Sequence, residues 1–303
     1  MTLRYNISVP ATSANLGPGY DCLGIALDIR LQATAIPADE WTVETRGEGS
    51  HLLDNCELNL IARAFRISCE NNGWPVQPMQ VESDNPIPIA RGLGSSAAAI
   101  VTGMALAQLA NSGDIDKDAL FREAAELEGH PDNVAAAVYG GLQEITREES
   151  PSLVHQRELA ESVKVLLVIP PQMKSTAELR EIVPDTIPAD LQRETDYALR
   201  QVLKGLASGN STQLRFSEQD HRHQPYRLEK QLESQAIFEI LQGIPQIAGV
   251  FLSGAGTTVA GWVVEDIDLV TLVEQRLSAH SIPAAVRLVS PDYEGVKGNV
   301  IHE

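Results

Sequence analysis

The chain has 303 residues, 43% of them hydrophobic, so it is long enough for one large domain or two moderate ones with a proper core. Its net charge of −18 argues against nucleic acid and anionic membranes as partners, because both require a basic surface. No apolar run reaches membrane-spanning length, and the N-terminal residues lack the apolar core of a secretion signal.

The first half of the chain alternates strand-like and helix-like segments. Strands are predicted where apolar residues alternate or run continuously, and helices where helix formers recur at helical spacing. Asp114 and Asp116 are N-cap candidates for the later of the helices. The predicted elements are strands at 4–10 and 24–35, a helix at 59–71, a strand at 79–83, helices at 97–110 and 116–129, and a strand at 141–146.

A polar stretch without a clear period, residues 147–159, predicts a domain boundary, with domains at 1–158 and 159–303. In the second half, the predicted elements are a strand at 163–169, helices at 189–208, 211–219 and 228–243, strands at 247–252 and 259–264, a helix at 269–279, and a strand at 284–289 that closes the sheet. Because strands and helices interleave in both halves, we expect an α+β fold.

The most informative segment is a glycine loop that precedes an alanine-rich helix. Residues 86–99 read PIPIARGLGSSAAA. Glycines allow sharp bends that expose backbone N–H groups, and a helix N-terminus attracts anions, so the segment indicates a phosphate site. The alternative is a tightly packed turn whose serine only caps the helix. The loop matches neither a Walker A motif nor the Rossmann glycine pattern.

Further polar groups stand among small residues in other segments. Asn15 and Asp21 lie between glycines, where Asx turns are the alternative to a binding role. Glu126 is expected near a helix C-terminus, where a carboxylate opposes the helix dipole; a bound cation would resolve this, and an exposed position is the alternative. Arg180 and Arg227 could clamp a carboxylate, or each could form a surface ion pair.

The cysteines and histidines do not indicate a metal site. Cys22, Cys56 and Cys69 have no metal-binding spacing and cannot all pair, which fits a reducing cytoplasm. His130, His221 and His223 match neither H-E-x-x-H nor a zinc finger, so we interpret them as packing or hydrogen-bonding residues.

Three motifs, in order, resemble those of the GHMP kinase superfamily. They are Pro10–Gly24, the P-x-x-x-G-L-G-S-S-A-A motif at Pro88–Ala98, and the S-G-x-G-P-T loop at Ser253–Thr258, in which Thr257 replaces the usual proline. The sequences EGHPDNVA, S-T-x-x-x-R-x-x-x-P and D-x-x-H-Q-P-Y-R resemble the homoserine kinase branch. The resemblance spans essentially the whole chain. It implies a two-domain GHMP kinase fold, with an N-terminal domain of the ribosomal S5 domain 2-like type and a ferredoxin-like C-terminal domain.

The resemblance also implies roles for residues at matching positions. Asp21 would pair with the ammonium group of homoserine, and Arg180 and Arg227 would hold its carboxylate. The implied substrate-binding residues are Asn15, Asp21, Asn133, Thr176, Arg180 and Arg227. Asn133, Ser96 and Glu126 are the implied catalytic residues, and Ser96 and Glu126 would hold Mg²⁺. The implied ATP-binding residues are Asn59, Pro88, Ile89, Ala90, Arg91, Gly92, Leu93, Gly94, Ser95, Ser96, Ala97 and Ala98.

The expected reaction is direct in-line phosphorylation of the homoserine hydroxyl by ATP without a side-chain base. Relatives such as mevalonate kinases carry an aspartate at the position of Asn133, whose amide cannot take a proton. Asp132 is adjacent, but neighbouring side chains usually point apart. Two alternatives stay open: a GHMP kinase acting on mevalonate or a sugar, and a non-catalytic binding or regulatory module. The cysteine usage predicts a cytoplasmic protein, and the resemblance implies a protein that is commonly a homodimer, although no interface signature is visible.

Overall fold

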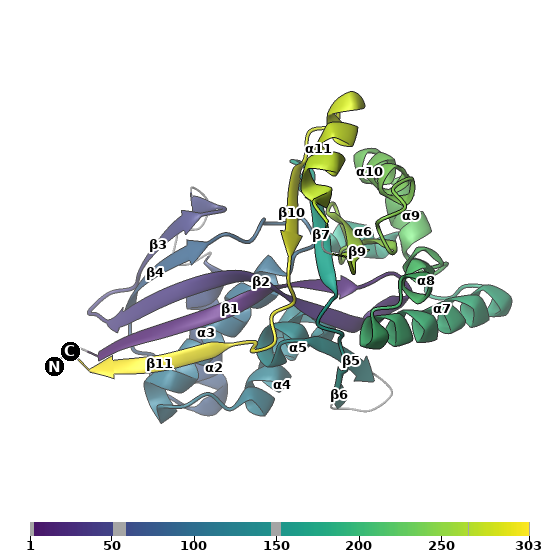
Figure 1. Ribbon diagram of the computed structural model, residues 1–303. Helices are drawn as coiled ribbons and strands as arrows, with labels where there is room; N and C mark the ends of the chain where they lie inside the picture. The colour runs from purple at the N-terminus through teal and green to yellow at the C-terminus, as the bar shows by residue number, and fades with distance from the viewer. Residues whose placement is uncertain (1–2, 51–58, 147–152, 266, 303) are drawn as a thin grey trace.

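The computed structural model describes residues 3–50, 59–146, 153–265 and 267–302. Cys56 and part of the predicted boundary segment lie outside the described residues. Two β-sheets, each accompanied by its own helices, form the molecule (Figure 1). None of the described helices is long and apolar enough to span a bilayer.

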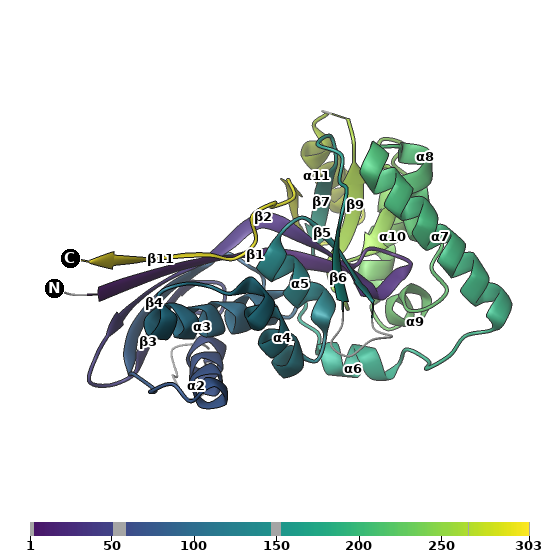
Figure 2. The same ribbon diagram turned by 90° about the horizontal axis from the view of Figure 1, so that it is seen from below.

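The first sheet has the order β11-β1-β2-β4-β3, and β5 joins it by pairing with both β2 and β6. Its strands are β1 Leu3–Asn15, β2 Gly19–Pro37, β3 Thr42–Gly47, β4 Met79–Asn85, β5 Leu142–Thr146, β6 Leu153–Arg157 and β11 Lys297–His302. Helices of the first half of the chain cover one side of this sheet (Figures 1 and 2). They are α2 Leu60–Asn72, α3 Ser95–Ser112, α4 Lys117–Glu128 and α5 Pro131–Tyr139.

The second sheet is antiparallel, with the order β10-β7-β9-β8. Its strands are β7 Lys164–Ile169, β8 Val250–Leu252, β9 Val259–Val263 and β10 Ala285–Val289. Figure 2 shows its helices gathered at the end of the molecule away from the termini. They are α6 Thr176–Glu181, α7 Ala189–Ser208, α8 Ser211–Leu214, the 3₁₀ helix η1 Arg215–Glu218, α9 Gln224–Glu229, α10 Leu232–Gln242 and α11 Leu269–Ala279.

The main elements predicted from the sequence are present, with characteristic differences. Asp116 caps α4, as predicted, by accepting the backbone N–H groups of Asp118 and Ala119. The helix predicted at 228–243 is divided into α9 and α10. Strands β3, β6 and β11 and helices α5 and α6 were not predicted, because each is short or has no continuous apolar period.

The chain passes from the first sheet to the second between Arg157 and Lys164, close to the predicted domain boundary. It then returns, because β11 pairs antiparallel with β1 at the edge of the first sheet. The division at residue 158 stays a prediction, and the last strand of the chain belongs to the sheet of the N-terminal half.

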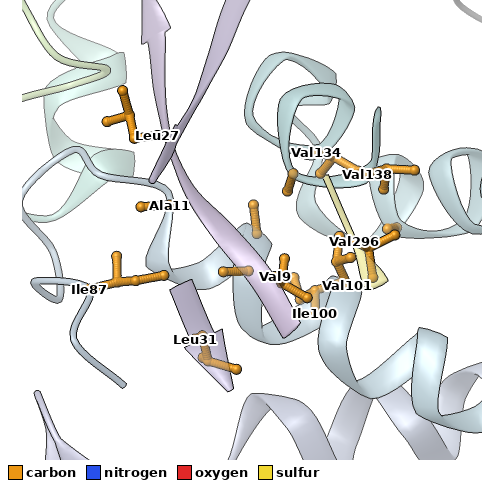
Figure 3. Close-up of a cluster of buried hydrophobic side chains, with 14 of the residues drawn as sticks. Val9, Ala11, Leu27, Leu31, Ile87, Ile100, Val101, Val134, Val138 and Val296 are labelled. Atoms are coloured by element: carbon orange, nitrogen blue, oxygen red, sulfur yellow. The ribbon is translucent and has the colours of Figure 1, made fainter. Parts of the chain in front are cut away.

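The hydrophobic core is continuous between the first sheet and its helices. Figure 3 shows Val9, Val101 and Val138 together with Val296, which precedes β11. The same cluster of buried side chains extends to Trp262 on β9 of the second sheet. Helix α3 is buried almost all round, in keeping with its alanine-rich sequence. The core therefore fixes the N-terminus of α3 where the two sheets meet.

Candidate active site

A cavity of about 290 Å³ lies at this junction. Its wall combines the glycine loop and the start of α3 from the first half of the chain with α6, α9 and Gly254 from the second half. Since both halves contribute, the cavity exists only in the complete fold. The predicted residues that line it are Asn15, Asp21, Asn59, Ile89, Ala90, Gly92, Leu93, Gly94, Ser95, Ser96, Asn133, Thr176, Arg180 and Arg227.

The glycine loop presents the first turn of α3 to the cavity. Gly92 and Gly94 have φ angles of 74° and 67°, which side chains other than glycine rarely adopt. A β-carbon on Gly94 would lie 1.8 Å from Oγ1 of Thr12, so the loop has no room for one. Gly94 is itself the N-cap of α3, and within the described part of the chain no side chain caps this helix. The capping alternative for the serines is therefore wrong: Ser95 and Ser96 lie inside the first turn and line the cavity.

Because no side chain among the described residues caps this helix end, its first-turn N–H groups are available to an anion. The tight space around Gly94 shows that the backbone must approach its neighbours closely here. Both features fit the phosphates of a nucleotide.

The carboxylate beside the glycine loop is Glu128, whereas the sequence predicted Glu126. Oγ of Ser96 donates a hydrogen bond of 2.6 Å to Oε1 of Glu128, and both residues line the cavity. Glu126 is exposed on the other side of α4, in a groove with Glu123 and Trp74. Two positions along a helix correspond to a rotation of about 200°, so the residues point in nearly opposite directions. The predicted position of Glu126 beside the glycine loop is thus corrected, and Glu128 is the candidate for the metal-ligand and catalytic roles.

Burial raises the pKa of Glu128 above its usual 4.5, and the hydrogen bond from Ser96 partly opposes this rise. A hydroxyl and a carboxylate are oxygen ligands of the kind that Mg²⁺ prefers, and Mg²⁺ takes few protein ligands. The residues present therefore fit a magnesium ion bound beside phosphates.

Asn133 is held by its neighbours at the cavity wall. Its Oδ1 accepts a 2.8 Å hydrogen bond from Oγ1 of Thr12, and its backbone N–H donates to Oδ1 of Asp132 at 2.8 Å. Asp132, expected to point away, also lines the cavity and is 3% exposed. A carboxylate and an amide thus lie side by side at the start of α5.

The other end of the cavity carries charge of both signs. Nη2 of Arg180 forms an ion pair with Oδ2 of Asp21, and the guanidinium of Arg227 is buried nearby. Nε of Arg227 donates to the carbonyl of Leu179 at 3.0 Å, and Nη1 donates to the carbonyl of Gly254 at 3.0 Å. Burial is the main cause of a lowered pKa for Arg227. Two guanidinium groups and one carboxylate thus meet at this end.

Asn15 and Asp21 owe their positions to an unusual turn. Both have positive φ angles, 69° and 58°, a conformation that Asn and Asp tolerate better than most residues. Oδ1 of Asn15 accepts the backbone N–H of Asp21 at 3.0 Å, and its Nδ2 donates to the carbonyl of Gly254 at 2.9 Å. The hydrogen bond from Asp21 to Asn15 spans six residues and so is not an Asx turn, and both residues line the cavity as predicted.

Several predicted ATP-binding residues do not line the cavity. Arg91 instead contacts Glu48 through Nη1 at 3.4 Å and the carbonyl of Pro171 through Nη2 at 3.0 Å. Asn59 lines the cavity but also caps α2, where its Oδ1 accepts the N–H groups of Ile61 and Ala62. The others that do not line it are Pro88, Ala97 and Ala98.

Sequence reasoning missed other lining residues. Lys174 and Ser175 precede the predicted Thr176, and His130 follows Glu128 by two positions. Their position in the sequence was the available signal, because Ser175 and His130 lie within motifs already recognised and Lys174 directly precedes one. The third loop, Ser253–Thr258, packs beside the site. Its Thr257 is 3% exposed, and Oγ1 of Thr257 donates to the carbonyl of Gln172 at 2.8 Å.

The comparisons with known proteins agree with this architecture. Residues 59–141 match the family model of the GHMP kinases N terminal domain. The chain is 39% identical to a homoserine kinase of Thermus thermophilus over 83% of this chain and 84% of that protein. It is 33% identical to a homoserine kinase of Clavibacter michiganensis, over 99% and 95% respectively.

Solved structures show the same fold. A homoserine kinase from Cytophaga hutchinsonii has a TM-score of 0.84 at 23% identity, covering 98% of this chain and 97% of that one. A putative homoserine kinase from Listeria monocytogenes has a TM-score of 0.78 at 28% identity, covering 99% and 100%. A mevalonate kinase, at 16% identity, shares the fold with a TM-score of 0.70, covering 95% and 99%.

Proposed function

Because this chain belongs to the homoserine kinases of the GHMP kinase superfamily, we propose that it transfers the γ-phosphoryl group of ATP to the side-chain hydroxyl of L-homoserine. The product is O-phospho-L-homoserine, an intermediate of threonine biosynthesis. The observation that carries the proposal is the pairing of an anion-binding helix end with a group of opposite charges in one cavity.

The phosphate end is formed by backbone groups. Ser95, Ser96 and Ala97 are the first three residues of α3, so their N–H groups have no partner within the helix. The triphosphate would bind there, where the helix dipole favours negative charge. Ser96 and Glu128 would hold Mg²⁺, which when bound neutralises charge on the phosphate oxygens.

The charged end is suited to an amino acid zwitterion. Asp21 and Arg180 neutralise each other in this structure. A ligand with one ammonium and one carboxylate group can separate them and leave each paired with an opposite charge. A ligand with a single charge would leave either Asp21 or Arg180 without an opposite charge, which is costly for partly buried groups. Arg227 would complete the carboxylate site.

The reaction requires orientation more than covalent assistance. Phosphoryl transfer depends mainly on positioning and charge stabilisation. The contacts of Asn133 with Thr12 and Asp132 hold its amide at the cavity wall, where it would orient the hydroxyl. Oδ1 of Asp132 already accepts the backbone N–H of Asn133. These contacts support in-line attack without a dedicated side-chain base.

A test is the release of ADP from ATP and Mg²⁺ in the presence of single acceptors. We expect turnover with L-homoserine, and at most weak turnover with mevalonate, a hexose, 3-aminopropan-1-ol or 4-hydroxybutyrate. The last two lack the carboxylate and the ammonium group of homoserine, respectively. Preference for mevalonate or the hexose would identify another GHMP kinase, and ATP binding without turnover on any acceptor would indicate a binding module.

The cellular setting is also a proposal. We place the enzyme in the cytoplasm, which is supported by the free thiol of Cys69. A homodimer is expected from the family resemblance, and sedimentation at micromolar concentration would test it.

A further inference from the structure

His223 is a fully buried histidine that contacts both the substrate end of the cavity and the first motif. It is 0% exposed and lies directly before α9, the helix that carries Arg227. Its Nε2 is 2.8 Å from the carbonyl oxygen of Gly17, and its Nδ1 is 3.2 Å from Nη1 of Arg227. The ring thus joins the turn between β1 and β2 to the guanidinium at the cavity wall.

These two contacts determine the protonation of the ring. A guanidinium can only donate hydrogen bonds, so Nδ1 must be the acceptor and carries no proton. A carbonyl oxygen can only accept, so the proton is on Nε2, directed at Gly17. His223 is therefore neutral, in the Nε2–H form, whenever both contacts are made.

Two further groups hold the ring in place. The carboxylate of Asp220 accepts the backbone N–H groups of Arg222, His223 and Gln224, and its Oδ2 is 3.4 Å from Nε2 of the ring. Tyr20 stacks on the ring with centroids 5.2 Å apart. Contacts of its nitrogen atoms hold the edge of the imidazole, and Tyr20 holds its face. The ring is therefore fixed firmly enough to orient the guanidinium of Arg227.

We propose that His223 is a positioning residue, which orients Nη1 of Arg227 through its unprotonated Nδ1 and so shapes the carboxylate-binding end of the cavity. The inference rests on the proposed function, in which Arg227 binds the substrate carboxylate. Nη1 has only two hydrogens, and the structure directs it to Gly254 and His223. Since Nε is directed to Leu179, Nη2 is the guanidinium nitrogen to which the described residues offer no hydrogen-bond acceptor, and it is left for the ligand.

Protonation of His223 at Nδ1 would break the hydrogen bond with Arg227, because two donors, Nδ1–H and Nη1–H, would then face each other. Burial lowers the pKa of His223, with Arg227 acting in the same direction and Asp220 opposing it. The charged and titratable groups around the ring are Tyr20 and Asp21 on β2, Arg180 on α6, Asp220 and Arg222 before α9, and Arg227 on α9. We therefore expect the KM for homoserine to rise on acidification, at a pH below the usual titration range of histidine.

Two amide variants distinguish the contribution of Nδ1 from that of Nε2. In His223→Asn the amide oxygen can take the place of Nδ1 as acceptor, whereas in His223→Gln the amide nitrogen can reach the place of Nε2 as donor. We expect a KM for homoserine within about twofold of wild type for Asn and about tenfold or more above it for Gln. The kcat and the KM for ATP should stay within about twofold in both, because neither nitrogen contacts the phosphate end.

The control is His221, two residues earlier, which is 35% exposed and pairs with Glu194 at 3.1 Å. The variant His221→Gln should leave all three kinetic constants unchanged. Equal increases of the KM in the Asn and Gln variants of His223, or no increase in either, would overturn the positioning role.

A measurement on the wild type does not depend on the folding of variants. Nitrogen NMR of the protein labelled in its histidine rings should show His223 neutral, with the proton on Nε2, at pH 7. A proton on Nδ1 would overturn the proposal. Absence of homoserine-dependent ADP release by the wild type would instead contradict the proposed function, and the NMR result would still decide the geometry.

Discussion

Glu126 and Glu128 have the same side chain and lie on the same helix, yet their surroundings differ. Glu126 is exposed, whereas Glu128 lines the cavity and accepts the hydroxyl of Ser96. Likewise, His221 faces solvent while His223 is buried against Arg227. At the scale of the residue, identical side chains at nearby positions therefore differ in proposed function because their surroundings differ. Three predictions follow from particular environments.

Glu128→Gln should raise the Mg²⁺ concentration needed for half-maximal activity and lower kcat by about tenfold or more, because an amide is a poorer ligand than a carboxylate. The measurement is initial rate against Mg²⁺ at saturating ATP and homoserine. Glu126→Gln is the matched control and should behave as wild type. The reverse pattern would restore Glu126 as the ligand. Since the pKa of Glu128 is raised, the Mg²⁺ requirement of the wild type should also increase at acidic pH.

Asn133→Asp should lower kcat by at least about tenfold, because it brings a negative charge to the cavity wall near the anionic phosphoryl group. The new carboxylate would also lie beside Asp132. Aspartate has an ordinary pKa of about 3.9 and is a weak base, and the like charge of Asp132 that would raise this pKa also adds to the repulsion, so we expect little gain in return. Kinetics of the variant and a pH profile of wild-type kcat are the measurements. An acidic limb that Asp132→Asn removes, with homoserine binding preserved, would identify Asp132 as a base.

His223 should make the stability of the fold depend on pH. Its folded pKa is lowered from 6.5, so the unfolded chain binds the proton more readily. The stabilisation is therefore complete above pH 6.5 and is lost as the pH falls towards the folded pKa, with a slope of up to about 1.4 kcal/mol per pH unit. Urea unfolding between pH 7.5 and 5.5 measures it. His223→Asn should show a smaller slope than wild type, while His221→Gln should not; identical slopes would contradict the assignment.

At the scale of the element, the glycine loop and α3 act as one unit. Most of α3 is buried, so its position is fixed by packing. Its N-terminus receives no cap from a side chain that the structure describes, and it opens into the cavity. Gly92 packs against the third loop, where a β-carbon would lie 2.1 Å from the carbonyl oxygen of Ser253. The loop is thus held between the helix and the second half of the chain.

Gly94→Ala should raise the KM for ATP by about tenfold or more, because the added methyl group collides with Thr12 and displaces the start of α3. Gly73→Ala is a matched control: Gly73 has a φ of 66° at the end of α2, but a β-carbon there meets nothing within 4 Å. It should cost about 1 kcal/mol of stability from backbone conformation alone and leave the KM for ATP unchanged. Equal effects of both variants on KM would show that space at Gly94 is unimportant.

At the scale of the whole molecule, the two halves share one buried cluster and one cavity, and a second buried cluster lies between the second sheet and helices α10 and α11. The buried cluster that contains Val9 also contains Trp262. The chain ends on the sheet where it began, since β11 pairs with β1. We therefore expect a single cooperative unfolding transition, with equal calorimetric and van't Hoff enthalpies.

A chain that ends at Val296 lacks β11 and should lose stability on the order of 3–6 kcal/mol. Six residues of β11 face β1 in register, and most of their side chains are exposed, so the lost stabilisation comes mainly from backbone hydrogen bonds. Thermal unfolding of the shortened chain is the measurement. Asn299→Thr, an exposed substitution that keeps the strand, should change stability little. Equal unfolding temperatures for the shortened and full chains would contradict the contribution of β11.

The sequence by itself determined the family, the α+β class and the residues of the glycine loop, because these depend on local patterns. An apolar period predicts α3, and two glycines beside serines predict an anion site wherever the loop is placed. The Asn15, Asp21, Arg180 and Arg227 motifs predicted cavity positions that the structure brings together. Their chemical roles stay predictions.

Only the tertiary structure decided which acidic residue faces Ser96 and what surrounds His223. The choice between Glu126 and Glu128 depends on the rotation of α4 about its axis, which is set by its packing against α3 and α5. The return of β11 to β1 joins residues almost 300 positions apart, and no local pattern encodes such a pairing. The contacts of His223 with Gly17 and Arg227 likewise arise where two halves of the chain meet. Long-range packing, which depends on all elements at once, therefore placed the groups that sequence motifs could only name.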